Sequence, residues 1–376
     1  MRIPKVLALV LAGGKGSRLG ALTQRRVKPA LPVAGTYRLI DISLSNLVHS
    51  HISDVWLVQQ YLPHSLNQHL ANGRPWDLDR SHGGLQVLPP FEGAEGEGFA
   101  QGNTDSIYRQ AGQIRDFDPD LVLVLSADHL YTVNFLDVID THLAKEAGLT
   151  MVVTEVSEDP SRYGVVQVDD DGLVTGFDYK PEEPHGTLVT GEMFLFDTGL
   201  LLEALDELAT RGELEDYGHD LVPYFLAHHR VAAHRLDRYW MDLGTLRSYW
   251  TAHMQLIDGE GAVLDDPAWP ILSAQPQLLP ARVHRSARVI DSLVSAGAEI
   301  HGTLEHSVVG PNVVVEAGAV VRDSVLLDGV VVASGADLER VIVDIGATVP
   351  GRAIGGPDRV TLIGADGTVD SREPLD

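Results

Sequence analysis

A glycine-rich loop near the start of the chain has the composition of a phosphate-binding site. In the segment LAGGKGSRL, residues 11–19, three glycines let backbone amides approach a phosphate closely: Gly13, Gly14 and Gly16. Cations in and after the loop would supply charge: Lys15, Arg18, Arg25, Arg26 and Lys28. The spacing matches neither the P-loop nor the dinucleotide-binding pattern, so a simple tight turn is the alternative. Further along, Lys180 in the segment FDYKP offers another point charge for a phosphate.

Two aspartates that are far apart in the sequence are candidate ligands of one divalent cation. Asp128 follows the apolar run of LVLVLSADHLY, residues 121–131, which places its carboxylate at the carboxyl edge of a sheet. Asp242 lies in the glycine-containing turn of YWMDLGT, residues 239–245. Hard oxygen ligands suit Mg²⁺, which commonly uses one or two carboxylates together with substrate phosphates. Either aspartate alone could instead cap a turn, so the predicted metal site requires that the two meet.

The segments around these residues predict a catalytic domain over residues 1–257. Short, apolar, β-branched runs bounded by turns predict buried strands at residues 6–12, 55–59, 121–126 and 149–153. Stretches with helical spacing predict helices at residues 39–50, 104–117, 134–147 and 246–256. This alternation indicates an α/β fold with a mostly parallel sheet covered by helices.

The last part of the chain, after a linker predicted at residues 258–281, has a different pattern of apolar residues. Apolar residues recur every 17 residues, as at Val308, Val325 and Ile342. Short units of this kind, with small residues at the corners, are typical of a parallel β-helix with about three hexapeptides per coil. We therefore predict about four coils in residues 282–376, and an array of hairpins is the alternative. Because so short a β-helix leaves an apolar end uncovered, we also expect a homo-oligomer.

The composition argues against several classes of partner and several kinds of site. The net charge is −25, with 53 acidic residues against 28 Lys and Arg, which argues against a nucleic-acid-binding surface. The chain has no cysteine, which excludes disulfides, a thiolate zinc site and a cysteine nucleophile, and which fits a reducing cytoplasm. The apolar run at residues 6–12 is too short to span a bilayer and lacks a signal-peptide pattern, so we expect a cytoplasmic protein with no membrane partner.

Taken together and in order, these motifs resemble those of the sugar-1-phosphate nucleotidyltransferases, and most closely the glucose-1-phosphate adenylyltransferase family. The matching segments cover nearly the whole chain: LAGGKGSRL, KPALPVAGTYRLIDISLSN at 28–46, QQYLPHSLNQHL at 59–70, GNTDSIY at 102–108, SADHLY, YKP, YWMDLGT and the β-helix. The resemblance implies a Rossmann-like catalytic domain followed by a left-handed parallel β-helix, assembled as a homotetramer. It also implies Mg²⁺-dependent transfer of a nucleotide from an NTP to a sugar 1-phosphate, with release of pyrophosphate.

The resemblance further implies a role for each matching residue. Arg18 would neutralise the departing pyrophosphate with help from Lys28, and Asp128 and Asp242 would hold Mg²⁺. The implied nucleotide-binding residues are Leu11, Ala12, Gly13, Gly14, Lys15, Gly16, Gln60, Gly102 and Asn103. The implied sugar-phosphate-binding residues are Asp105, Tyr163, Gly164, Tyr179, Lys180, Glu192 and Asp242. The sugar-phosphate oxygen would attack the α-phosphorus directly, so no protein nucleophile is expected.

The chain departs from the family pattern around the expected pockets. Tyr179 replaces the glutamate that usually precedes the lysine of YKP, and Glu192 replaces a small residue. We hypothesise that the Glu192 carboxylate re-enters the sugar pocket from another side. Residues 90–93 and 99–100, normally near the base and the regulatory cleft, also differ.

These departures leave several functions open. ATP with glucose 1-phosphate is the leading expectation. The alternatives are the same chemistry on another base or acceptor, such as GTP with the cyclitol valienol 1-phosphate, a catalytically silent regulatory subunit, and acyl transfer on the β-helix.

Overall fold

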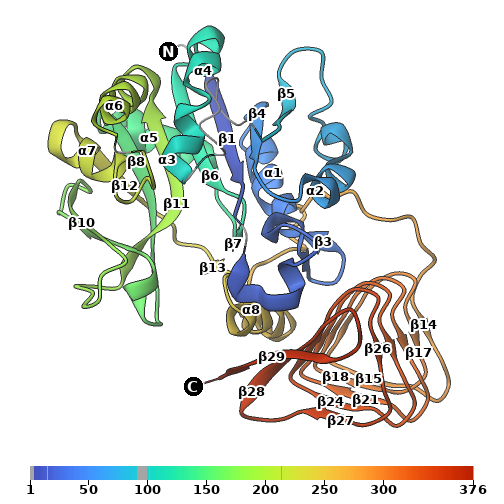
Figure 1. Ribbon diagram of the computed structural model, residues 1–376. Coiled ribbons are helices and arrows are strands. Elements are labelled where there is room, and N and C mark those ends of the chain that lie inside the picture. Colours follow the sequence, from blue (N-terminus) through green and yellow to red (C-terminus); the bar gives the residue numbers. More distant parts are fainter. Residues whose placement is uncertain (1–3, 15, 91–99, 101, 213, 376) are drawn as a thin grey trace.

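The computed structural model describes residues 4–14, 16–90, 100, 102–212 and 214–375. An α/β part that carries the glycine loop lies beside a C-terminal β-helix, and a long connection joins the two (Figure 1). Helix α8 ends at Asp258 and the first β-helix strand begins at Arg282.

A nine-stranded mixed sheet organises the α/β part. Its central strands run parallel to one another: β5 (Gly84–Leu88), β4 (Asp54–Gln59), β1 (Val6–Ala12) and β6 (Leu121–Ser126). The sheet continues through antiparallel β11 (Leu188–Asp197) to the remaining strands: β8 (Leu149–Glu155), β12 (Val231–Arg235), β9 (Gly164–Val168) and β10 (Val174–Tyr179). The α/β fold with a mostly parallel sheet that the sequence predicts is thereby confirmed.

Alternating residues of the central strands pack into two hydrophobic cores, one on each face of the sheet. In β6, Leu121, Leu123 and Leu125 enter one core, whereas Val122 and Val124 enter the other. A strand that is buried on both faces packs apolar side chains on each side, so all of its residues can be hydrophobic. This explains the unbroken apolar run of β6. The polar residues that follow the run therefore lie at the carboxyl edge of the sheet.

Helices cover both faces (Figure 1). One core contains residues of α1 (Leu39–His49), α2 (Pro63–Leu70), α5 (Phe135–Ala144) and α8 (Leu246–Asp258). The other contains residues of α3 (Asn103–Tyr108), α4 (Ala111–Phe117), α6 (Thr198–Arg211) and α7 (Leu221–His228). The shorter elements are the 3₁₀ helices η1 (Ser17–Thr23), η2 (Lys28–Ala30), η3 (Ala71–Trp76) and η4 (Pro160–Arg162), the pair β2 (Pro32–Val33) and β3 (Tyr37–Arg38), and the pair β7 (His129–Tyr131) and β13 (Trp240–Asp242).

The single helix predicted at residues 104–117 is wrong, because α3 and α4 are separate helices with a turn between them. The Gln110 N–H donates to the Ile107 carbonyl, three residues back, and this tighter bond ends the α-helical pattern. The turn leaves α3 as a short helix whose first residues lie next to the glycine loop.

Three stacks of short parallel strands form the β-helix. The first stack is β14 (Arg282–Val283), β17 (Glu299–Ile300), β20 (Val314–Val315), β23 (Val331–Val332) and β26 (Thr348–Val349). The second is β15 (Arg288–Ile290), β18 (Thr303–Glu305), β21 (Val320–Arg322), β24 (Asp337–Glu339) and β27 (Ala353–Gly355). The third is β16 (Leu293–Val294), β19 (Val308–Val309), β22 (Val325–Leu326), β25 (Val341–Val343) and β28 (Arg359–Ile363), closed by antiparallel β29 (Val369–Pro374).

The 17-residue repeat corresponds to one coil, as predicted. Val308 pairs with Val325, which pairs with Ile342, so that like residues stack in one column. The step between the first two coils is uneven, since Val283 pairs with Ile300 after 17 residues whereas Leu293 pairs with Val308 after 15. Within residues 282–355 the first two stacks are five strands deep, so the expected number of about four coils is too low by one. The sequence repeat missed this coil because the step between the first two coils is uneven.

The two parts share one hydrophobic core and several polar contacts. Residues of η1, α1 and α8 belong to the same core as Val308, Val325, Ile342 and Leu362 of the β-helix. Arg26 donates to the buried Asp344 carboxylate at 2.6 Å, and Arg38 pairs with Asp328 at 2.7 Å. Across the described part of the chain, no helix combines the length and apolar character needed to cross a membrane.

Candidate active site

A lysine and two aspartates meet at the carboxyl edge of the sheet. Asp128 follows β6, and Asp242 ends β13, which pairs with β7 so that Asp242 faces His129. Lys28 begins η2, after the glycine loop. Its Nζ lies 2.9 Å from Asp128 Oδ2 and 2.7 Å from Asp242 Oδ1. Residues separated by 100 and 214 positions from Lys28 therefore converge on one cationic group.

The opposite charges in this buried cluster shift the pKa values of its members. Burial alone would lower the pKa of Lys28, but the neighbouring carboxylates of Asp128 and Asp242 raise it above its ordinary value. Burial alone would also raise the pKa of Asp128, but Lys28, followed by His129, holds that pKa well below its ordinary value. The Ser126 hydroxyl donates to the same carboxylate. The lysine and Asp128 are therefore both charged at neutral pH.

Further nitrogen-containing side chains surround Asp242. Its carboxylate lies 3.7 Å from His129 Nε2 and 3.8 Å from Nη2 of Arg162, which has no hydrogen-bond partner within the described ranges. A Cβ placed on Gly244 would lie 2.6 Å from Asp242 Oδ2 and 3.2 Å from Arg18 Nη2. The Arg18 guanidinium therefore also lies near the Asp242 carboxylate. Arg18 itself is exposed on η1. Arg162 was missed in the sequence, because a lone arginine in a loop carries no spacing signal.

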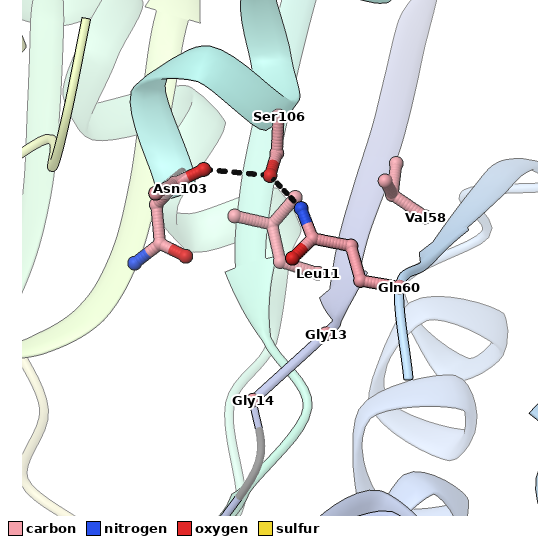
Figure 2. Close-up of a pocket in the computed structure, with 8 residues that line it drawn as sticks. Leu11, Gly13, Gly14, Val58, Gln60, Asn103 and Ser106 are labelled. Atoms are coloured by element: carbon pink, nitrogen blue, oxygen red, sulfur yellow. Dashed lines mark hydrogen bonds between the residues drawn. The ribbon is translucent and has the colours of Figure 1, made fainter. Parts of the chain in front are cut away.

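A cavity of about 190 Å³ lies beside the glycine loop (Figure 2). Its lining comes from the ends of β1 and β4 and from the start of α3: Leu11, Gly13, Gly14, Val58, Gln60, Gly102, Asn103 and Ser106. The Gln60 side-chain amide donates to the Ser106 hydroxyl, which donates to the Gly102 carbonyl at 2.6 Å. Ser106 was not singled out in the sequence, although it lies one helical turn after Gly102. Ala12 is buried at the end of β1.

Gly102 is required by a close backbone contact. A Cβ at this position would lie 1.7 Å from the carbonyl oxygen of Glu215, which no side chain could tolerate without movement of one backbone. The contact holds the start of α3 against the loop that precedes α7, and it thereby fixes one wall of the cavity.

A second cavity, of about 200 Å³, continues from the first. The two share Leu11, Gly13, Gly14 and Asn103. The rest of its lining is more polar: Lys28, Pro29, Ser126, Asp128, Tyr179, Lys180, Glu192, Asp216 and Tyr217. Lys28 and Asp128 thus line the polar cavity, which shares the glycine loop with a cavity whose lining carries no charged side chain.

A bulge in β11 directs Glu192 toward this second cavity. The register of β11 against β8 shifts between Thr190 and Phe194, and Glu192 has a positive φ of 57°. Burial raises the pKa of Glu192, and the Tyr217 hydroxyl donates to its carboxylate. The Lys180 ammonium donates to the Tyr179 hydroxyl at 2.7 Å. Tyr179, Lys180 and Glu192 therefore line the same cavity.

Several predicted site residues lie elsewhere. Asp105 pairs with Arg109 one turn along α3, at 3.0 Å, outside both cavity linings. Tyr163 packs edge-on against Trp240, and Gly164 lies under Phe177. Arg26 binds Asp344 in the β-helix instead of contributing to a cluster of phosphate-binding cations. Gly16 has a left-handed φ of 61° just before η1. Lys15 and residues 91–99 lie outside the described residues, so the expectations placed on them have no structural counterpart.

Comparison with known families identifies the class of protein. Residues 7–259 match the nucleotidyl transferase family, and residues 276–369 match the GlmU-like C-terminal hexapeptide family. The chain is therefore a nucleotidyltransferase enzyme with a hexapeptide-repeat β-helix, and its catalytic domain supports transfer from an NTP to a sugar 1-phosphate.

Proteins with similar sequences identify the family within this class. The glucose-1-phosphate adenylyltransferase of Thermotoga maritima is 40% identical over 321 residues, which cover 84% of this chain and 76% of the relative. That of Bacillus cereus (strain Q1) is 37% identical over 343 residues, which cover 90% of this chain and 91% of the relative. The chain belongs to the glucose-1-phosphate adenylyltransferase family, which confirms the resemblance found in its motifs.

The Lys28 cluster also fits the metal that enzymes of this kind generally use, a divalent cation. Asp128 and Asp242 supply hard carboxylate oxygens, and both contact the same ammonium group, so they already face a single cation position. His129 and Glu192 add further donors, since their ligand atoms and that of Asp128 lie within 4.8 Å of one another. The donor set therefore suits a divalent ion.

Proposed function

We propose that this enzyme transfers the adenylyl group of ATP to glucose 1-phosphate, giving ADP-glucose and pyrophosphate, with Mg²⁺ as its metal. The observation that carries the proposal is that Lys28, which contacts Asp128 and Asp242, lines a polar cavity that shares the glycine loop with a neighbouring cavity. The names of the similar proteins supply the base and the sugar.

In the proposed complex, the base and ribose occupy the cavity lined by Gln60, Asn103 and Ser106. The triphosphate lies along Gly13 and Gly14, and a Cβ added to Gly14 would meet no heavy atom within 4 Å among the described residues. Lys28 provides a buried positive charge next to the α-phosphate, and the exposed Arg18 attracts the leaving pyrophosphate. These fixed charges stabilise the transition state because they need no reorganisation during the reaction.

Asp128 and Asp242 would hold Mg²⁺, which when bound offsets the charge of two phosphorylated substrates. Magnesium is proposed over softer metals because the two aspartates supply carboxylate oxygens. In an acidic protein, with a net charge of −25, two polyanionic substrates need such compensation.

The acceptor would bind in the second cavity, with its phosphate near Lys180 and its hydroxyl groups facing Glu192 and Tyr217. Since Tyr179 replaces the usual glutamate, Glu192 is the carboxylate that would select the acceptor. Replacing Glu192 by alanine should raise the KM for the sugar phosphate by about tenfold, consistent with the loss of a hydrogen bond to a charged group. An unchanged KM would show that Glu192 does not contact the acceptor.

A pyrophosphate-release assay with four NTPs and several sugar and cyclitol 1-phosphates tests the proposal. We expect the highest kcat/KM for ATP with glucose 1-phosphate. The Tyr179 and Glu192 substitutions favour one further candidate, a cyclitol phosphate acceptor, and preference for GTP with valienol 1-phosphate would replace the first proposal by that one. No turnover with any pair by a folded protein that binds NTP would indicate a regulatory subunit instead.

We further propose a cytoplasmic homotetramer. The first coil of the β-helix and the segment before it expose apolar side chains that an assembly would cover, with Leu279, Val283 and Leu293 exposed by 81%, 56% and 40%. Light scattering after size-exclusion chromatography tests this part, and a monomeric mass would contradict it.

A further inference from the structure

Two histidines and a glutamate meet on the first coils of the β-helix, at the end opposite β28 and β29 (Figure 1). His284 follows β14 and His301 follows β17. Their rings are stacked, with centroids 3.6 Å apart and an interplanar angle of 17°. Glu299 Oε2 lies 3.8 Å from His301 Nε2, and one ligand atom from each of the three residues lies within 4.8 Å of the others.

The coil geometry holds these side chains together. Val283 pairs with Ile300, so the residues that follow them lie one above the other. The His284 N–H donates to the Ile300 carbonyl at 2.9 Å, and the His301 N–H donates to the Val315 carbonyl at 2.8 Å. Both histidines are therefore attached to a rigid ladder, and their approach does not depend on a flexible loop.

One imidazole nitrogen at this position lacks a partner. His284 Nε2 is shielded from solvent and finds no hydrogen-bond partner in the part of the chain that the structure describes. Buried polar atoms are nearly always hydrogen-bonded, so an unpaired nitrogen next to another imidazole and a carboxylate points to a ligand. Stacking alone would account for the two rings, but it would leave this nitrogen unsatisfied.

We infer that His284, Glu299 and His301 form a binding site for a divalent transition-metal ion, with Zn²⁺ as the preferred ion. Zinc is bound by imidazole nitrogen and carboxylate oxygen, and three protein ligands with water in the fourth position are a common set. Imidazole ligands also select against Mg²⁺, which separates this site from the proposed catalytic one. The positive charge of Arg282, which acts on His284, opposes the ion and limits its affinity.

The ion would join the first coil to the second. In the described chain β14 pairs only with β17, so the first coil has a strand neighbour on one side alone. The ends of a solenoid are its least stable repeats, because interactions between neighbouring repeats supply much of their stability. Zinc binding should therefore raise the thermal stability of the β-helix without changing the chemistry at the glycine loop.

Calorimetric titration of ZnCl₂ into the full chain, stripped with EDTA and kept in excess Mg²⁺, tests the inference. We expect one Zn²⁺ per chain outside the carboxylate site. His284→Ala and His301→Ala should each weaken binding at least tenfold, and Glu299→Gln should weaken it less. His82→Ala, which removes an exposed histidine from the α/β part, should leave it unchanged.

Two further measurements distinguish the site from general histidine binding. With one equivalent of Cu²⁺, electron paramagnetic resonance should show coupling to nitrogen in the native chain and lose it in His301→Ala. Zinc should raise the midpoint of thermal unfolding of the native chain but not of that variant. Turnover with Mg²⁺ and NTP confirms that each variant is folded, and Glu299→Gln serves if a histidine variant is not. Absence of Zn²⁺ binding, or equal binding by native and variant chains, would overturn the inference.

Discussion

At the scale of single residues, the centre of the site is a buried lysine that contacts two carboxylates. Lys28 is nearly inaccessible, with 5% of its surface exposed, and it contacts Asp128 and Asp242 at hydrogen-bond distances. An ion pair of this kind is costly to form but far more costly to break on one side, since an unpaired charge then remains buried. The lysine therefore contributes to both the shape and the chemistry of the site.

Replacement of Lys28 by methionine should preserve side-chain length and remove the charge. We expect kcat to fall by about 10²–10³, as for loss of one preorganised stabilising group, and the protein to unfold at lower denaturant concentration because two acids lose their cation. Pyrophosphate release and urea unfolding measure the two effects. Lys145→Met, near the surface, is the control, and equal activity of the two variants would contradict the role of Lys28.

Glu192 should make stability depend on pH. Burial raises its pKa in the folded protein, so the folded state retains a proton that the unfolded state releases above about pH 4.3. Its favourable contribution is therefore complete below that pH and is lost as pH rises. We expect Glu192→Gln to be more stable than the native chain at pH 7 and to approach it near pH 4. Urea unfolding at both values measures this, and a difference that grows toward low pH would have the wrong sign.

The sequence predicted the members of this cluster better than their contacts. Motif order located Lys28, Asp128 and Asp242, because each follows a recognisable strand or loop. That Lys28 contacts both acids depends on the β7–β13 pairing, which joins segments more than 100 residues apart and which no local pattern records. The protein partners of Arg26 and Asp105, which are Asp344 and Arg109, were likewise not predicted.

At the scale of elements, the cavity beside the glycine loop depends on where α3 begins. The backbone of Gly102 contacts the loop before α7, and the turn after Tyr108 separates α3 from α4. Helical periodicity predicted one continuous helix because both halves place apolar residues on the same core. The four predicted strands agree nearly to the residue with β1, β4, β6 and β8, since their apolar runs end where the sheet ends. The other strands of the sheet were not predicted from an apolar run.

Gly102→Ala should disturb this element selectively. Its Cβ would overlap the Glu215 carbonyl, so α3 must move away from the nucleotide cavity, and we expect the KM for NTP to rise at least tenfold. Gly112→Ala is the matched control, because its Cβ would meet no heavy atom within 4 Å among the described residues apart from its own helix and its chain neighbours. That change should stabilise α4 by about 0.5–1 kcal/mol. Similar KM values for the two variants would rule out the proposed role of Gly102.

At the scale of the whole molecule, the catalytic part and the β-helix form one folding unit. They share a hydrophobic core, and the buried Arg26–Asp344 pair crosses the boundary between them. The 17-residue repeat predicted the β-helix itself, but nothing in a repeat indicates which side of it packs against another domain. The shared core is therefore a finding of the structure.

Loss of the ion pair between the catalytic part and the β-helix should strongly destabilise the protein. Arg26→Ala leaves Asp344 buried without its cation, and we expect a destabilisation of about 3–5 kcal/mol. Arg115→Ala, which removes an exposed pair with Asp206, should cost about 0–1 kcal/mol. Chemical unfolding of both variants provides the comparison, and equal losses would show that the boundary contributes little.

The contact between η1 and β29 links the segment after the glycine loop to the last strand of the β-helix. Gly20 has a backbone conformation that favours glycine, and Asp370 accepts a hydrogen bond from the Ala21 N–H at 3.3 Å. Segments that are 349 positions apart in the sequence therefore support each other. We expect a chain truncated before Asp370 to lose activity, because the segment after the glycine loop then lacks this support although the α/β sheet is complete.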